Sequence, residues 1–205
     1  MSLFLSFLNS AVYKYYPKNL YNSDPLYYES REAKAFMLLR NEYQNKTFLN
    51  QLTEFKEILK TVYPDKWINI NKTEIITPCY QIEIVQEKNH SIERTTTIYL
   101  SMLVPFYHMI NLNVDYDFQR KHKEKHGSFH KQYYSTSFNI DKELKNFIST
   151  KVLEHFYYNE FPRELLNLKI PDVFALNSTE IINYRKAFFT DSYKMSHAQY
   201  HIDKI

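Results

Sequence analysis

Only one glycine, Gly127, occurs among the 205 residues of this chain. Glycine adopts positive φ without steric cost, so left-handed backbone positions here must be filled by Asn or Asp, which tolerate that region next best. A P-loop, a dinucleotide-binding turn and a hydrolase nucleophile elbow all need glycines or other small residues. We therefore expect no nucleotide-cradling loop and no cofactor.

The composition predicts one globular domain spanning residues 1–205, with a flexible tail from about residue 190. Hydrophobic residues make up 44% of the chain and aromatic residues 17%, enough for a sizeable core. The single cysteine, Cys79, excludes an internal disulfide and favours a reducing compartment. No apolar run is long enough to span a bilayer. These features predict a cytoplasmic protein with no membrane partner.

The first third of the sequence has helical periodicity. Asp24 followed by Pro25 is typical of a helix start, and apolar residues recur at helical spacing as far as Tyr63. The spacing slips at residues 45–46, which predicts a kink or two separate helices. Pro64 ends the segment.

The middle of the sequence changes to the two-residue period of strands. Residues 80–84 and 97–103 alternate, and the polar stretch 87–93 between them predicts a turn. Residues 110–118 alternate without a miss, and residues 133–140 alternate again. The last two runs predict an antiparallel hairpin with a long polar tip, with Leu112 on its buried face.

Helical periodicity returns near the C-terminus. Asp141 is suited to cap a helix that continues to about residue 156, and Pro162 opens a short helical turn. Asn177 and Glu180 resemble the capping arrangement of a helix ending near Phe189. The predicted class is α+β, with a mainly antiparallel sheet of about four strands (roughly residues 80–140) flanked by N-terminal and C-terminal helices.

The polar side of the predicted strand 110–118 is the first candidate binding site. It carries Asn111, Asn113, Asp115 and Asp117. This row suits three interpretations: a docking surface for a protein partner, a catalytic or metal-binding carboxylate pair, or simply the solvated side of a sheet. Same-face neighbours on a strand lie about 7 Å apart, which is loose for a shared metal ion.

The second candidate is the basic hairpin tip at residues 119–131. Its cations, suited to phosphate or nucleic acid, are Arg120, Lys121, Lys123, Lys125 and Lys131. His122, His126 and His130 have a spacing of four, which would bring them together on a helix. Because five cations surround them, we expect a solvated tip and no bound metal.

The remaining chemistry-bearing residues have structural explanations. Cys79 begins a strand, and a buried thiol is its default role. Tyrosines crowd the N-terminal region, where they suit an interface or reflect biased composition.

The sequence carries no motif for a reaction. We predict a non-enzymatic domain that binds another protein, such as an immunity protein that neutralises a toxin. The alternatives are a nucleic-acid-associated protein that uses the basic tip and exposed tyrosines, and an enzyme with scattered site residues. The sequence leaves the oligomeric state open.

Overall fold

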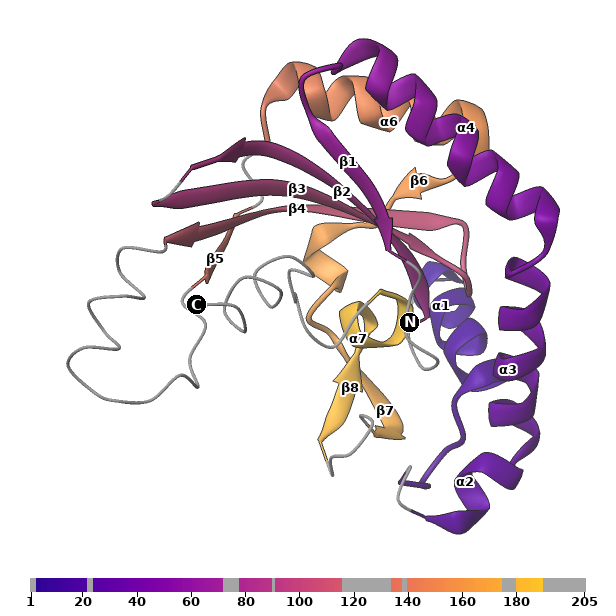
Figure 1. The fold of residues 1–205 in the computed structure, drawn as a ribbon. Helices are drawn as coiled ribbons and strands as arrows, with labels where there is room; N and C mark the ends of the chain where they lie inside the picture. The colour runs from indigo at the N-terminus through magenta and orange to yellow at the C-terminus, as the bar shows by residue number, and fades with distance from the viewer. Residues whose placement is uncertain are drawn as a thin grey trace.

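The computed structural model describes residues 3–21, 24–71, 78–89, 91–115, 134–137, 140–174 and 180–189. Its helices are α1 (Leu3–Tyr15), α2 (Pro25–Glu29), α3 (Arg31–Tyr43), α4 (Lys46–Val62), α6 (Lys142–Phe156) and α7 (Tyr184–Phe188), with a short 3₁₀ turn, η1 (Arg163–Leu165). Its strands are β1 (Trp67–Asn71), β2 (Cys79–Lys88), β3 (Ile92–Ser101), β4 (Phe106–Asp115), β5 (Tyr134–Ser137), β6 (Asn159–Glu160), β7 (Lys169–Phe174) and β8 (Ile181–Asn183). Helices, a sheet and further helices follow one another, so the predicted α+β class is confirmed (Figure 1).

Side-chain caps divide the N-terminal helical segment into three. The Asp24 carboxylate accepts from the backbone N–H of Leu26 at 2.8 Å, as the Asp-Pro pair predicted. The Asn45 side chain accepts from Phe48 N at 2.9 Å, which confirms a helix boundary at residues 45–46. A further break at Ser30, whose hydroxyl caps α3, was not predicted.

The main sheet is antiparallel in the order β1-β2-β3-β4-β5, with β6 parallel to β4. The predicted hairpin is confirmed over its described part, where Leu112 pairs with Thr136 and Val114 with Tyr134. The β2–β3 pair is longer than the sequence predicted, because its turn occupies only about three residues. β1 and β6 were not anticipated.

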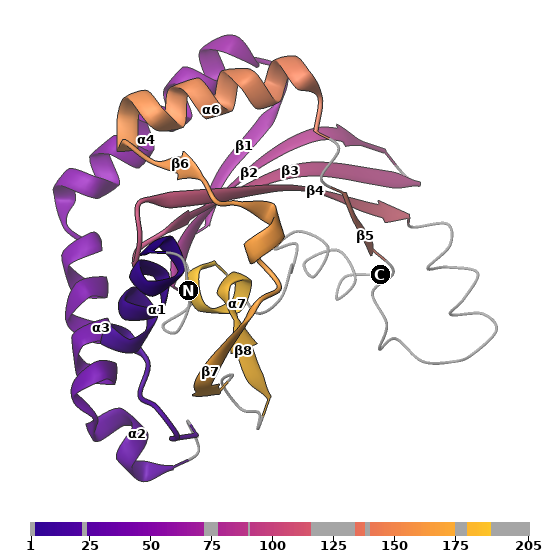
Figure 2. The same cartoon turned by 180° about the vertical axis from the view of Figure 1, so that it is seen from behind.

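Both faces of the sheet are covered. Figures 1 and 2 show α4 and α6 side by side over one face, with α1 and α7 against the other. The α4–α6 side buries an apolar cluster that includes Phe55, Ile82 and Met109. The α1–α7 side buries a second cluster that includes Leu8, Leu112 and Phe188. Leu112 is fully buried, so its assignment to a core face is confirmed.

The C-terminal part differs from the prediction. No helix leads from Glu180 to Phe189: residues 181–183 form β8, which pairs with β7, and α7 begins only at Tyr184. The Asn183 side chain caps α7 by accepting from Lys186 N at 3.0 Å. Asn177 lies outside the described residues. The predicted helix after Asp141 and the turn after Pro162 are confirmed as α6 and η1.

Positive φ occurs at three non-glycine residues in the described chain: Asn19, Tyr157 and Asp172. Two of them are the residue types that the glycine shortage predicted; Tyr157 is the exception. None of the described helices is long and apolar enough to cross a membrane.

Candidate functional site

The predicted polar row on β4 is only partly described. Asn111 and Asn113 are half-buried on the α4–α6 side of the sheet. The Asn111 side-chain oxygen accepts from the hydroxyl of Thr96 at 2.6 Å, and that hydroxyl accepts in turn from the Gln86 amide at 2.6 Å. Asn111 is therefore part of a hydrogen-bonded row across three strands. Asp115 is the last residue of β4, and its side chain lies outside the described part of the chain.

The other predicted site residues lie outside the described residues. They are Asp117, the cations Arg120, Lys121, Lys123, Lys125 and Lys131, and the histidines His122, His126 and His130. In the part of the chain that the structure describes, no three His, Cys, Asp or Glu side chains are placed to hold a metal ion.

A pocket of about 410 Å³ opens where α3 ends, α4 begins and α6 ends. It is lined by Glu42, Tyr43, Asn45, Thr47, Phe48, Gln51, His155, Phe156, Tyr157 and Tyr158. We call it the aromatic pocket. The volume is at the lower end of the range for small-ligand sites. The helix break at residues 45–46 and the antiparallel arrangement of α4 and α6 bring these segments together.

Aromatic rings packed edge-on or tilted against one another form the floor of the aromatic pocket. The Phe48 ring lies 4.8 Å from that of Tyr43, 5.1 Å from that of Tyr80 and 5.8 Å from that of Phe156, measured between centroids. His155 packs edge-on against Phe55 at 6.1 Å, and its Nε2 is buried without a hydrogen-bond partner. Aromatic pairs at these separations stabilise one another, so the floor of the pocket is packed by its own side chains.

Two hydrogen bonds made by tyrosine hydroxyls fix the wall of the pocket. The Tyr80 hydroxyl donates to the backbone carbonyl of Tyr43 at 2.7 Å, and the hydroxyl oxygens of Tyr43 and Tyr158 lie 3.2 Å apart. Burial, and then the neighbouring Tyr43, raises the pKa of Tyr158 well above its ordinary value. Tyr158 therefore stays a neutral phenol and acts in positioning, not as a base.

Tyr157 differs from every other residue that lines the pocket. It caps the C-terminus of α6 in the left-handed region, with φ 58° and ψ 32°, and its N–H donates to the carbonyl of Leu153 at 3.0 Å. Its side chain is 78% exposed. Glycine is the usual residue at this capping position, because a side chain there costs about 1–2 kcal/mol. A residue with a strained backbone conformation thus places a largely exposed aromatic side chain beside the pocket.

A second polar cluster lies on the α1–α7 side of the sheet. Glu83, Glu93, Thr95, Thr97 and His108 are all at most 2% exposed. The Thr95 and Thr97 hydroxyls have no hydrogen-bond partner. Burial and, to a smaller extent, the neighbouring Arg163 and Arg185 together lower the pKa of His108 to about 3, so the imidazole is uncharged near neutral pH. Because these side chains are closed to solvent, the cluster is not an open site.

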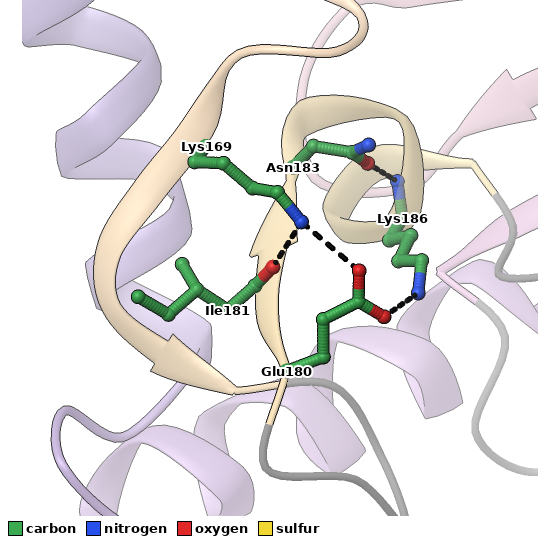
Figure 3. A network of polar contacts seen from close by, with 5 residues as sticks. All are labelled: Lys169, Glu180, Ile181, Asn183 and Lys186. Carbon is green, nitrogen blue, oxygen red and sulfur yellow. Dashed lines mark hydrogen bonds and ion pairs between the residues drawn. The ribbon is translucent and has the colours of Figure 1, made fainter.

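An exposed ion-pair network joins β7 to β8 and α7 (Figure 3). The Glu180 carboxylate accepts from Lys169 at 3.0 Å and from Lys186 at 2.9 Å. Lys169 also donates to the carbonyl of Ile181. The two lysines lower the pKa of Glu180 to about 2. These hydrogen bonds and ion pairs all join residues of this chain to one another, so we assign the network a structural role.

Cys79 is a buried structural thiol, as predicted. Its Sγ donates to the carbonyl of Phe189, and burial raises its pKa far above the ordinary value. A nucleophile or metal ligand needs the thiolate, which this environment disfavours.

The sequence analysis missed the aromatic pocket as a site. It predicted only helical segments around Tyr43, Phe48 and Phe156, and it gave no role to Tyr157. Two signals were present: the slip in spacing at residues 45–46, and a helix that ends at residue 156 in a stretch without glycine. Neither indicates that the two segments meet. No family model, curated protein or solved structure matches this chain.

Proposed function

We propose that this chain is a non-enzymatic binding protein that holds another protein at the aromatic pocket. The observation that carries the proposal is Tyr157, a strained and largely exposed tyrosine at the pocket rim. A left-handed tyrosine lowers the stability of the free protein, and such outliers cluster where function requires them. We propose the role of an immunity protein, acting in the cytoplasm and neutralising a toxin by covering it.

The composition of the pocket supports this role. Tyrosine is enriched among the residues that dominate binding energy at protein interfaces, because it buries a large area and loses little rotamer entropy. Tyr157 is exposed and lines the pocket, and Tyr43 is half-buried and packs against the Phe48 ring of the floor. Leu153, one turn before Tyr157 on α6, is 48% exposed and adds apolar surface near Tyr157. A preformed site loses little free energy to ordering when it binds.

The test compares two exposed tyrosines. Tyr157→Ala removes the rim residue, while Tyr28→Ala removes a tyrosine on α2 that is 49% exposed and does not line the pocket. The tagged full chain and both variants are used to capture proteins from an extract of the source organism. The captured protein is identified and purified, and its affinity for each variant is measured by calorimetry.

We expect Tyr157→Ala to weaken binding of that protein at least about thirtyfold, the usual effect of truncating a dominant interface residue. Tyr28→Ala should bind within about twofold of the unmodified chain. Equal binding by all three proteins would show that the pocket is not the interface. Turnover of a small molecule by the pure protein, lost in Tyr157→Ala, would instead indicate an enzyme.

A further inference from the structure

We infer that the aromatic pocket accepts a basic side chain of the partner protein, with arginine as the best fit. This inference rests on the proposed function and specifies its partner chemistry. Glu42 is the only Asp, Glu, Lys or Arg among the residues that line the pocket. It is exposed in the last turn of α3, where its carboxylate is free to meet a cation.

The helix ends add to the negative potential of the pocket. α3 ends at Tyr43 and α6 ends at Phe156, so both C-termini meet at this site. Each helix C-terminus carries the equivalent of about half a negative charge on its last carbonyls. These two ends and the Glu42 carboxylate favour a positively charged group.

One helix end has the opposite sign. The first turn of α4 lines the pocket and would suit an anion. However, the side-chain oxygen of Asn45 already occupies the N–H of Phe48 at 2.9 Å. An anion would have to displace this cap and also approach Glu42. The buried guanidinium of Arg40, two residues before Glu42 on α3, offsets part of the negative potential, but it does not line the pocket. Taken together, the charged side chains and the helix ends at the pocket therefore favour a cation over an anion.

The rings and amides of the pocket suit a guanidinium in particular. A planar guanidinium stacks on aromatic faces such as those of Tyr43 and Tyr157, and it carries five N–H donors. Asn45, Thr47 and Gln51 line the same pocket, and side chains of these types carry oxygens that can accept such hydrogen bonds. A partner rich in arginine, such as a toxin that binds nucleic acid, would offer this side chain at its own active surface.

The experiment uses three small probes with the full chain. N-acetylarginine methylamide carries the proposed group, N-acetylcitrulline methylamide is its uncharged isostere, and N-acetylglutamate methylamide carries the opposite charge. Binding is followed by NMR through the backbone amide signals of Thr47 and Tyr157, with Tyr28 as a distant reference.

We expect the arginine probe to bind with a dissociation constant on the order of millimolar, because a single side chain supplies few contacts. The citrulline probe should bind at least about tenfold more weakly, since it lacks the charge. Glu42→Gln should weaken arginine binding about two- to fivefold, the range for a solvent-exposed ion pair. Glu54→Gln changes an exposed acid of α4 that does not line the pocket, and it should have no effect.

Equal binding of arginine and citrulline, preferential binding of the glutamate probe, or no binding by any probe would each overturn the inference. The proposed function fails separately. If Tyr157→Ala abolishes partner binding while the arginine probe does not bind, the proposed protein-binding role stands. The inference that the pocket accepts a basic side chain is then wrong. If the arginine probe binds but partner affinity is unchanged in Tyr157→Ala, the pocket is a cation site and the proposed interface lies elsewhere.

Discussion

Replacing Tyr157 tests whether its backbone is strained. Tyr157 has φ 58° at the C-terminus of α6, where glycine would have no steric cost. We expect Tyr157→Gly to be more stable than Tyr157→Ala. Everywhere in a regular helix the order is reversed, because alanine exceeds glycine in helix propensity by about 1 kcal/mol.

The expected magnitude follows from three contributions. A non-glycine residue in the left-handed region costs about 1–2 kcal/mol, which only Tyr157→Gly removes. Glycine is also more flexible in the unfolded chain, which lowers the free energy of unfolding by about 0.5–1 kcal/mol and so offsets part of that gain. Both variants lose the small buried part of a ring that is 78% exposed, a loss of about 0.5 kcal/mol. The free energy of unfolding should therefore be about 0.5–1 kcal/mol higher for glycine than for alanine.

Urea denaturation at neutral pH measures this difference, with Asn146→Gly and Asn146→Ala as the matched pair. Asn146 is exposed in the middle of α6, so there alanine should be the more stable variant. The reasoning is refuted if alanine is also the more stable variant at position 157, because the left-handed conformation would then carry no cost. Both Tyr157 variants should lose partner binding, although one is expected to be nearly as stable as the unmodified chain.

Three further predictions concern stability. Thr97→Val should raise the free energy of unfolding by about 1 kcal/mol, because it removes a buried hydroxyl without a hydrogen-bond partner. Thr96→Val should lower it by about the same amount, because it breaks two hydrogen bonds. A higher melting temperature for Thr96→Val than for Thr97→Val would contradict this. Leu112→Asp should prevent folding because an unpaired charge would enter the core, and a melting temperature within about two degrees of the unmodified chain would refute it. Glu180→Gln should reduce stability at pH 7, and the difference from the unmodified chain should shrink as the pH falls from 4.5 towards 2. The reason is that the two lysines lower the folded-state pKa of Glu180 to about 2. A difference in stability that does not change with pH would contradict the contact with the two lysines.

The parts of the fold that could be predicted are those in which one period continues over many residues. The alternation around Leu112 identified β4, and the cap at Asp141 identified α6. β6 and β8 contain two and three residues, too few for a period to be recognised. β8 was mistaken for helix because Asn177 and Glu180 have capping spacing, whereas the residue that caps α7 is Asn183.

Burial of polar residues was the harder property to predict. The sequence placed Glu93 in a polar turn and Thr97 at the start of an alternating run, and neither pattern showed that both would be as buried as Ile98. Whether a polar strand face meets water depends on elements distant in sequence, such as α1 and α7. The aromatic pocket has the same origin, since residues near 45 and near 157 meet only through the packing of α4 on α6.

The shortage of glycine connects the fold to the proposed site. At two of the three positive-φ positions the chain has Asn19 and Asp172, the residues that adopt this conformation most readily after glycine. Asn19 also donates to the carbonyl of Asp172 at 2.8 Å, so those two positions support each other's turns. Tyr157, by contrast, is largely exposed to solvent. Asn or Gly would adopt its left-handed backbone conformation at a lower steric cost. A side chain that weakens the free protein and contacts little of it fits the proposed role in binding a partner, so Tyr157 is the residue to change first.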